Sequence, residues 1–325
     1  MIKKILLSLL FLMPLTAYAD DSANTKPEEA KVVEGEAAEA DEEKDVDEKV
    51  LRLTLGAEVT NQYFFRGLRQ ENQGFIAQPW AELKLSLYSN NWLTDVRAVV
   101  GTWNSFHSGP TGAASKADTP AAWYETRFHA GAEADLFKHI TVGGGYMVYT
   151  SPNDSLETVH EFYITLAIDD YYVWHDLSPE ELLEKGEKLI WNGVRPRGKI
   201  AFESAGQRDN GLNNGVYAEA SIRPSWTLNY GFVFTVAVPV KIGFSVDQYY
   251  EKPVTTPGRL PRDDAFGFTD IGLEGDFPLA FLGDKWGELS LTVGGHWLYL
   301  GQNTSAVNNG DKHVGIATGG FRFRY

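Results

Sequence analysis

The chain has 325 residues, a formal net charge of −15 and 13% aromatic residues, and it contains no cysteine. The acidic balance excludes a typical nucleic-acid-binding protein, because such proteins present a basic surface to the phosphates. Without cysteine the chain has no disulfides, thiolate metal ligands or cysteine nucleophiles.

The first 19 residues have the pattern of a secretory signal peptide. Lys3 and Lys4 give a positive start, an apolar run follows at 5–16, and Ala-Tyr-Ala precedes Asp20 at the expected cleavage site. The apolar run is too short for a transmembrane helix, so we expect export from the cytoplasm.

Residues 20–50 form an acidic segment with 13 acidic residues, 4 lysines and no aromatic residue. Such a composition cannot bury enough apolar surface to offset the entropy of ordering. We therefore predict a disordered periplasmic segment here, followed by a folded domain over 51–325.

From residue 51 onward, apolar and polar residues alternate with a period of two. In 75–87, for example, Leu83 and Leu85 share one face of a strand, while Glu82 and Lys84 share the other. The alternating runs are longer than strands of soluble proteins usually are. They predict an all-β fold, a transmembrane antiparallel β-barrel rather than a soluble sandwich, because a closed barrel satisfies every backbone hydrogen bond in lipid.

Twelve strands are expected, an even number as in bacterial outer-membrane barrels. The connections alternate between short and long, which places both ends of the barrel domain on the periplasmic side of the outer membrane of a Gram-negative-type bacterium. The longest connection, about 177–213, is predicted to be an external insertion, although its Lys-Ile-Ala-Phe-Glu-Ser stretch could also be a barrel strand. The predicted strands are 51–64, 75–88, 92–104, 122–136, 139–150, 157–168, 171–176, 214–226, 230–246, 265–277, 286–300 and 313–325.

The last predicted strand ends in an alternating aromatic pattern. Phe321, Phe323 and Tyr325 share one face, and the chain ends on an aromatic residue as many outer-membrane proteins do. We predict that these three residues form a signal for the barrel-assembly machinery.

The polar faces of the strands predict a charged lumen. These charges could set the size and ion selectivity of a narrow channel, or they could pair across the bore and close it. The candidate pore charges are Arg66, Glu82, Lys84, Asp95, Arg97, Glu125, Arg127, Glu133, Asp270, Glu274, Arg322 and Arg324.

The sequence contains no hydrolase, zinc or phosphate-loop motif. We therefore predict no enzymatic activity, no catalytic residues, no cofactor and no metal. One enzymatic alternative is a lipid hydrolase at the barrel rim, where His160 shares the parity of Phe162 and Ile164, but no serine is obviously matched to it.

Two stretches carry patterns that are more specific than the alternation. One is the end of the first strand, with Tyr63, Phe65, Arg66, Gly67 and Gln70, and the other is 143–166. Both resemble the TorF-type porin family of small outer-membrane β-barrels, and 143–166 is similar to the central hairpin of that family. The resemblance implies a barrel and a porin.

The parity of the first strand also predicts where these residues point. Tyr63 and Phe65 continue the apolar parity, so we expect them in a lipid-facing aromatic girdle. Phe64 and Arg66 are expected to point inward at the mouth, before an external loop over 69–74.

The function predicted from the sequence is passive diffusion of small polar solutes or ions through a narrow outer-membrane porin. The alternative is a closed structural or adhesion barrel that binds a partner through its external loops. The expected partners are outer-membrane lipid, the assembly machinery and the solutes, with no nucleic acid, and the oligomeric state is open.

Overall fold

The computed structural model describes residues 50–113, 120–175, 189–207, 214–229, 232–251, 263–279 and 287–325. The predicted signal peptide and all of the predicted acidic segment except Val50 lie outside the described residues.

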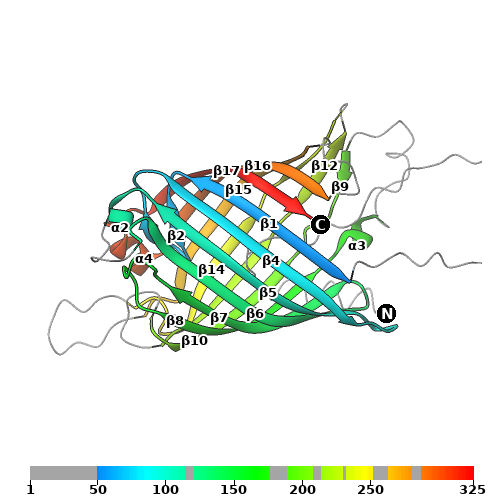
Figure 1. Cartoon of the computed structure of the whole chain (residues 1–325), viewed down its shortest axis with the longest axis horizontal. Helices are drawn as coiled ribbons and strands as arrows, with labels where there is room; N and C mark the ends of the chain where they lie inside the picture. Colours follow the sequence, from blue (N-terminus) through cyan, green and yellow to red (C-terminus); the bar gives the residue numbers. More distant parts are fainter. Residues whose placement is uncertain are drawn as a thin grey trace, which may run out of the picture.

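The described strands form one large antiparallel sheet that closes into a barrel (Figure 1). The prediction of a twelve-strand transmembrane-type barrel is confirmed. Two of the twelve strands are interrupted at Pro224 and Pro239, because proline has no N–H to donate to the ladder. The carbonyl groups of both prolines still accept hydrogen bonds, from Val238 (2.9 Å) and Gly272 (2.8 Å), so the wall stays continuous there.

The barrel strands are, in chain order, β1 (Leu51–Thr60), β4 (Ile76–Tyr88), β5 (Leu93–His107), β6 (Trp123–Leu136), β7 (Ile140–Thr150), β8 (Val159–Ile168), β10 (Arg197–Ala205), β11 with β12 (Val216–Ile222 and Ser225–Asn229), β13 with β14 (Val233–Ala237 and Val240–Asp247), β15 (Phe266–Pro278), β16 (Glu288–Leu300) and β17 (His313–Arg324). A further short strand, β9 (Leu189–Trp191), pairs with β12 at one end of the barrel.

The seventh barrel strand is not where the sequence analysis placed it. Residues 171–176 were predicted as a strand, but α3 (Tyr171–His175) is a short helix. The seventh strand is β10, which pairs with β8 and β11. The prediction of a single external insertion over 177–213 is therefore wrong, because residues 197–205 belong to the barrel wall. The sequence signal for this strand is the alternation of Lys199, Ala201 and Glu203 with the apolar residues Ile200 and Phe202.

The two ends of the barrel differ (Figure 1). One end holds the short turns, α3, β9 and the C-terminal residue; we call it the short-turn end. There the Asp169 amide donates to the carbonyl oxygen of His139 (2.8 Å), which ties the residues before α3 to the turn after β6. The opposite end, the long-loop end, carries α2 (Pro110–Ala113), α4 (Gln302–Val307) and a hairpin of β2 (Tyr63–Phe65) and β3 (Leu68–Glu71).

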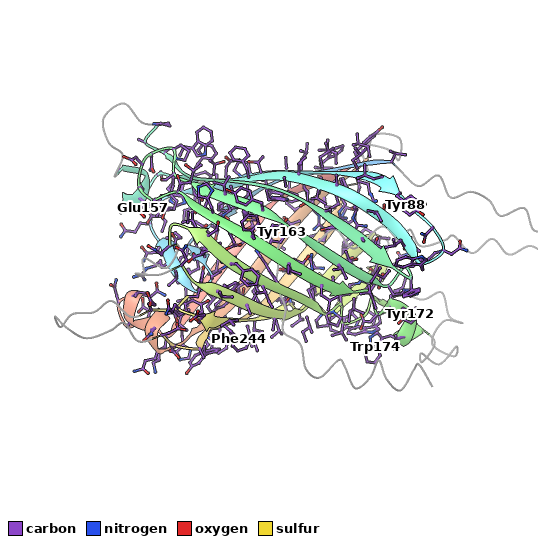
Figure 2. All side chains as sticks on the ribbon, turned by 90° about the horizontal axis from the view of Figure 1, so that it is seen from below. Tyr88, Glu157, Tyr163, Tyr172, Trp174 and Phe244 are labelled. Carbon is purple, nitrogen blue, oxygen red and sulfur yellow. The ribbon has the colours of Figure 1, made fainter. Side chains whose placement is uncertain are left out.

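The outer surface of the wall is apolar. Leu273, Ile164 and Phe321 are each more than half exposed, and side chains project from the barrel on all sides (Figure 2). Exposed aromatic residues lie toward both ends, for example Tyr88 at the short-turn end and Trp297 toward α4. An apolar band between aromatic girdles is the surface of a barrel embedded in lipid. No helix in the described part of the chain is long and apolar enough to cross a membrane.

Candidate pore

The β2–β3 hairpin folds into the bore at the long-loop end. Its turn is formed by Arg66 (φ 49°) and Gly67 (φ 79°), and a Cβ at Gly67 would lie only 3.1 Å from the Phe268 side chain of β15. Tyr63 and Phe65, expected in the lipid-facing girdle, are only 6% and 8% exposed and pack inside the barrel. That prediction was wrong because β1 ends at Thr60 and the parity of the wall does not continue through residues 61 and 62.

Arg66 occupies the buried tip of the hairpin. Its guanidinium makes a two-pronged ion pair with Glu161 of β8 (2.7 and 2.9 Å) and donates to the hydroxyl of Tyr249 (3.1 Å). The guanidinium carbon lies 4.0 Å from the centre of the Tyr217 ring. Both partners of the ion pair are almost fully buried, at 5% and 1% side-chain exposure. Arg66 therefore points inward as expected, but it lies inside the bore and not at the mouth.

A second buried ion pair holds the base of the hairpin. The Tyr63 hydroxyl donates to Glu125 of β6 (2.9 Å) and also contacts Arg127, which donates to Glu125 (2.7 Å). The Arg127 guanidinium lies 4.0 Å from the Trp103 ring centre and 4.5 Å from that of Phe65. Glu125 and Arg127, both predicted as pore charges, thus contact the hairpin directly.

Glu71 anchors the far end of the hairpin to α2. One carboxylate oxygen accepts hydrogen bonds from the hydroxyl (2.7 Å) and the amide (2.9 Å) of Thr111. The other accepts from the amides of Asn72 (2.8 Å) and Gln73 (3.0 Å). Burial by itself raises the pKa of Glu71, but these hydrogen bonds outweigh it and hold the pKa below its ordinary value of 4.5.

This anchor makes the position of the hairpin sensitive to acid. Because the pKa of Glu71 is lowered in the anchored state, the anchor is fully present above pH 4.5 and is lost as the pH falls through the lowered pKa. We expect Glu71→Gln to reduce this response, which can be measured as protease cleavage within 63–71 between pH 7 and pH 3. Thr158→Ala, at the edge of another loop, is the control; an unchanged acid response in Glu71→Gln would contradict the assignment.

The wall formed by β4, β5 and β6 carries a continuous ion-pair network. Arg97 donates to Glu133 (2.8 Å) and Asp135 (2.5 Å) and lies 3.1 Å from Asp95. Lys84 lies 3.1 Å from the same Glu133. Arg97 therefore contacts three carboxylates at once. Around this centre, Arg52 pairs with Asp95, and Glu82 contacts Lys84 (3.4 Å) and His129 (3.1 Å).

The facing wall, from β11 to β17, holds one smaller network around Glu274 and two separate ion pairs. Arg223 donates to Glu274 (2.9 Å), and His296 contacts Asp270 (3.0 Å) and Glu274 (3.6 Å). Toward the short-turn end, Arg322 pairs with Asp276 and Arg324 with Glu288 (3.0 Å).

All the residues predicted as pore charges thus lie on the inside of the barrel, although the structure divides them into three groups. Their role in permeation stays a prediction. Arg66, Glu125 and Arg127 lie at the hairpin, Glu82, Lys84, Asp95, Arg97 and Glu133 on the first wall, and Asp270, Glu274, Arg322 and Arg324 on the facing wall.

The sequence analysis missed Lys199 and the tyrosines around the hairpin. Lys199 lies 3.5 Å from Glu161, and it was missed because β10 was assigned to a loop. Tyr249 and Tyr250 follow the end of β14 and are almost completely buried. No local pattern distinguishes such tyrosines from ordinary loop residues, since their burial depends on the hairpin that folds into the bore.

The hydrolase alternative placed His160 at the rim. Its ring hydrogen-bonds the Tyr146 hydroxyl on the outer surface, while Ser204 donates to the His160 carbonyl oxygen and not to the ring (3.2 Å). Within the described residues this arrangement does not form a serine–histidine pair.

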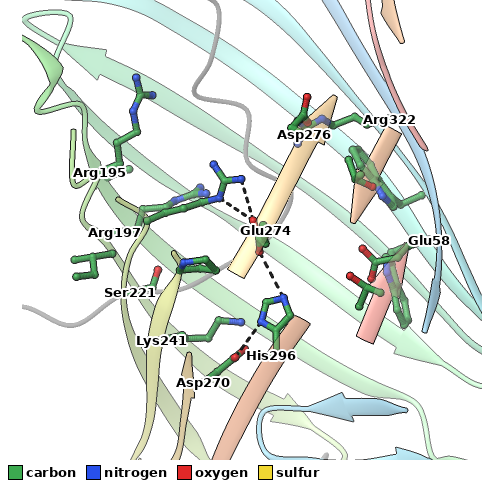
Figure 3. A pocket seen from close by; sticks show the side chains of 18 of the residues that line it. Glu58, Arg195, Arg197, Ser221, Lys241, Asp270, Glu274, Asp276, His296 and Arg322 are labelled. Carbon is green, nitrogen blue, oxygen red and sulfur yellow. Dashed lines mark hydrogen bonds and ion pairs between the residues drawn. The ribbon is translucent and has the colours of Figure 1, made fainter. Parts of the chain in front are cut away.

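The described residues enclose a larger and a smaller cavity inside the barrel. The larger, about 440 Å³, lies between the two walls and reaches Asp169 and Arg195 at the short-turn end (Figure 3). The smaller, about 160 Å³, lies against the hairpin and is lined by Arg66, Arg127 and Lys199. Trp103 and Lys241 line both cavities, so the cavities adjoin.

No protein-family model matches the chain, and no curated protein matches it in sequence. Among solved structures, it is similar to an outer-membrane channel from Pseudomonas putida F1 (11% identity, 85% of this chain and 95% of that chain, TM-score 0.43). It is also similar to the NanC porin (10% identity, 85% and 98%, TM-score 0.37) and to the transport unit of the autotransporter AIDA-I from Escherichia coli (10% identity, 87% and 92%, TM-score 0.38).

The class of the protein follows from its own geometry. A closed barrel with an apolar band outside and ion pairs inside is a β-barrel of the outer-membrane class.

Proposed function

We propose that the protein is a narrow outer-membrane channel for passive diffusion of small polar solutes or ions, and that the β2–β3 hairpin restricts its bore. The observation that carries the proposal is the larger cavity, which is lined by charged side chains from both walls and extends from mid-barrel to the short-turn end. A barrel whose interior is closed by packed side chains would not be expected to contain a charged cavity of this size. The resemblance to TorF-type porins points in the same direction.

The direct test is single-channel recording in a planar lipid bilayer. We expect small, discrete conductance steps from purified protein whose folding is verified by heat-modifiable migration on a gel. Folded protein that gives no steps above the lipid background in either orientation would contradict the channel.

The alternative is a closed structural or adhesion barrel. It is favoured by one observation, the two buried ion pairs that hold the hairpin in the bore at the long-loop end. The two functions differ in what release of the hairpin does. A restricted channel conducts more after release, whereas a closed barrel has no conducting state that release would enlarge.

We also propose that the short-turn end faces the periplasm and that the C-terminal aromatic residues are read by the barrel-assembly machinery. Phe321 is 53% exposed and Tyr325 is 50% exposed, and both are on the outer side of β17 with Phe323. An exposed strand end is accessible to an assembly factor before the barrel closes against β1.

Deletion of Tyr325 tests the assembly signal. Because the Tyr325 amide and carbonyl also bond Leu53 (2.8 and 3.0 Å), the matched variant is Tyr325→Ser, which keeps this backbone pairing. We expect both variants to lower the yield of folded barrel in cells by more than about twofold, measured by heat-modifiable migration, while refolding in detergent is affected only by the deletion. Normal yield of Tyr325→Ser in cells would contradict the signal.

A further inference from the structure

Three polar side chains form a row across the barrel wall beside the larger cavity. Arg197 of β10 is opposite Ser221 of β11, and Ser221 is opposite Lys241 of β14. Residues directly opposite on antiparallel strands have Cβ atoms about 4.5–5.5 Å apart. The row therefore places one cationic side chain on each side of Ser221, and all three side chains line the cavity (Figure 3).

Lys241 lines both cavities and has no ion pair within the described residues. Asp270, its neighbour across to β15, could supply one, but Asp270 is bonded to the ring of His296 (3.0 Å). Glu274, on the same strand, is bonded to Arg223 (2.9 Å). Asp270 and Glu274 thus already have partners, and Lys241 lines both cavities.

The neighbouring part of the wall holds two further basic residues and the acidic Glu219, which is opposite Lys199 and lines the smaller cavity with it. Lys199 of β10, two residues beyond Arg197, lines the smaller cavity, and Arg195 lines the larger one before the strand begins. Arg195 lies 3.7 Å from Asp169, and Lys199 lies 3.5 Å from Glu161. The part of the wall built by β10, β11 and β14 therefore presents an excess of positive charge to the larger cavity.

We propose that Arg197, Ser221 and Lys241 form a binding subsite for a small anion that carries a carboxylate or phosphate group. Arginine is suited to two-pronged contacts with such groups, lysine supplies a compact positive charge, and a hydroxyl can donate a third hydrogen bond. A cavity of about 440 Å³ holds a small organic anion. The subsite deepens the proposed function, since it names the solute class of the channel.

Lys241 lies where a bound solute would pass from one cavity to the other. It lines both of them, so an anion held at the row is at the border between the wide bore and the hairpin. Multiple adjoining binding positions allow entry and exit, because no single position has to bind tightly.

The test is calorimetric titration of the full-length protein in detergent with inorganic phosphate and, separately, with succinate. We expect binding of at least one anion and, for Lys241→Gln, an affinity that is lower by about tenfold, as for the loss of a charge-assisted contact. Lys312→Gln, an exposed loop lysine outside both cavities, is the matched control. If Lys241→Gln does not fold, Ser221→Ala and Arg197→Gln replace it with the same expectation.

The outcomes separate the subsite from the channel. No binding of either anion, or equal affinity in Lys241→Gln and wild type, overturns the subsite whether or not the protein conducts. Binding that depends on Lys241 supports the subsite even if bilayers show no conductance, in which case the channel function alone fails. Phosphate tests recognition of a phosphate group, and succinate tests recognition of a carboxylate group. Two tryptophans that line the larger cavity, Trp80 and Trp103, give a second readout by fluorescence.

Discussion

Glu161→Gln is expected to raise the single-channel conductance by at least about twofold, because it removes the acid that holds two buried cations. Arg66 at the hairpin tip lies 2.7 Å from Glu161, and Lys199 lies 3.5 Å from it. Removing one partner of a buried ion pair costs about 3–5 kcal/mol, since the other charge is left without compensation. The wall strands are hydrogen-bonded on both sides, whereas β2 and β3 pair only with each other. The hairpin is therefore the part that moves, and its movement takes Arg66 out of the buried site.

The matched control is Glu288→Gln. Glu288 also pairs with an arginine on the inner side of the barrel, but it lies at the short-turn end and its side chain is about half exposed. We expect this variant to keep the wild-type conductance. Equal conductance of Glu161→Gln and wild type, with both folded, would show that the hairpin does not limit passage.

Arg97→Gln is expected to make the channel more selective for cations. Arg97 contacts Asp95, Glu133 and Asp135, and Arg97 and Glu133 line the larger cavity. Without the positive charge of Arg97, the negative charges of these three carboxylates are less well balanced. One unit charge at about 4 Å contributes about 1 kcal/mol even at the dielectric constant of water, so we expect the cation-to-anion permeability ratio to rise by about fivefold.

The measurement is the reversal potential in a potassium chloride gradient. Arg97→Lys keeps the charge and should restore most of the wild-type value, whereas Arg324→Gln removes an arginine that does not line the larger cavity and should change it little. A reversal potential that is the same in Arg97→Gln and wild type would remove Arg97 from the permeation path.

The barrel wall could be predicted from the sequence because period-two alternation reports directly which side of a strand is apolar. In β4, Leu83 and Leu85 alternate with Glu82 and Lys84, and the structure places the charged pair inside. At β10 the alternation was left undecided, because the strand lies within the long connection over 177–213 that was predicted to be an external insertion.

The hairpin could not be predicted in the same way. Tyr63 and Phe65 keep the apolar parity of β1, but a bend before them turns the chain into the bore, and parity does not report such a bend. Their burial depends on contacts with Glu125, Tyr149 and other residues far away in the sequence. The local sign that this loop is buried was the run of three aromatic residues, 63–65, directly before Arg66.

The central claim is that the hairpin inside the bore controls passage, and a reversible tether tests it most directly. A Cβ at Gly67 would lie 3.1 Å from the Cβ of Phe268, slightly closer than the usual 3.5–4.5 Å of a disulfide. The bridge therefore needs a small shift of the two residues, and the cysteine at 67 has to adopt the left-handed conformation of Gly67 (φ 79°) at some cost in stability. Because the chain has no cysteine of its own, Gly67→Cys with Phe268→Cys can form only this intramolecular bridge.

The tether is introduced into the Glu161→Gln chain, and its formation is verified by mass spectrometry before recording. We predict low conductance in the oxidised protein and, in the same channel, a rise of at least about twofold when reductant is added, because reduction frees a hairpin that Glu161 no longer holds. Conductance that is the same before and after reduction would contradict the account.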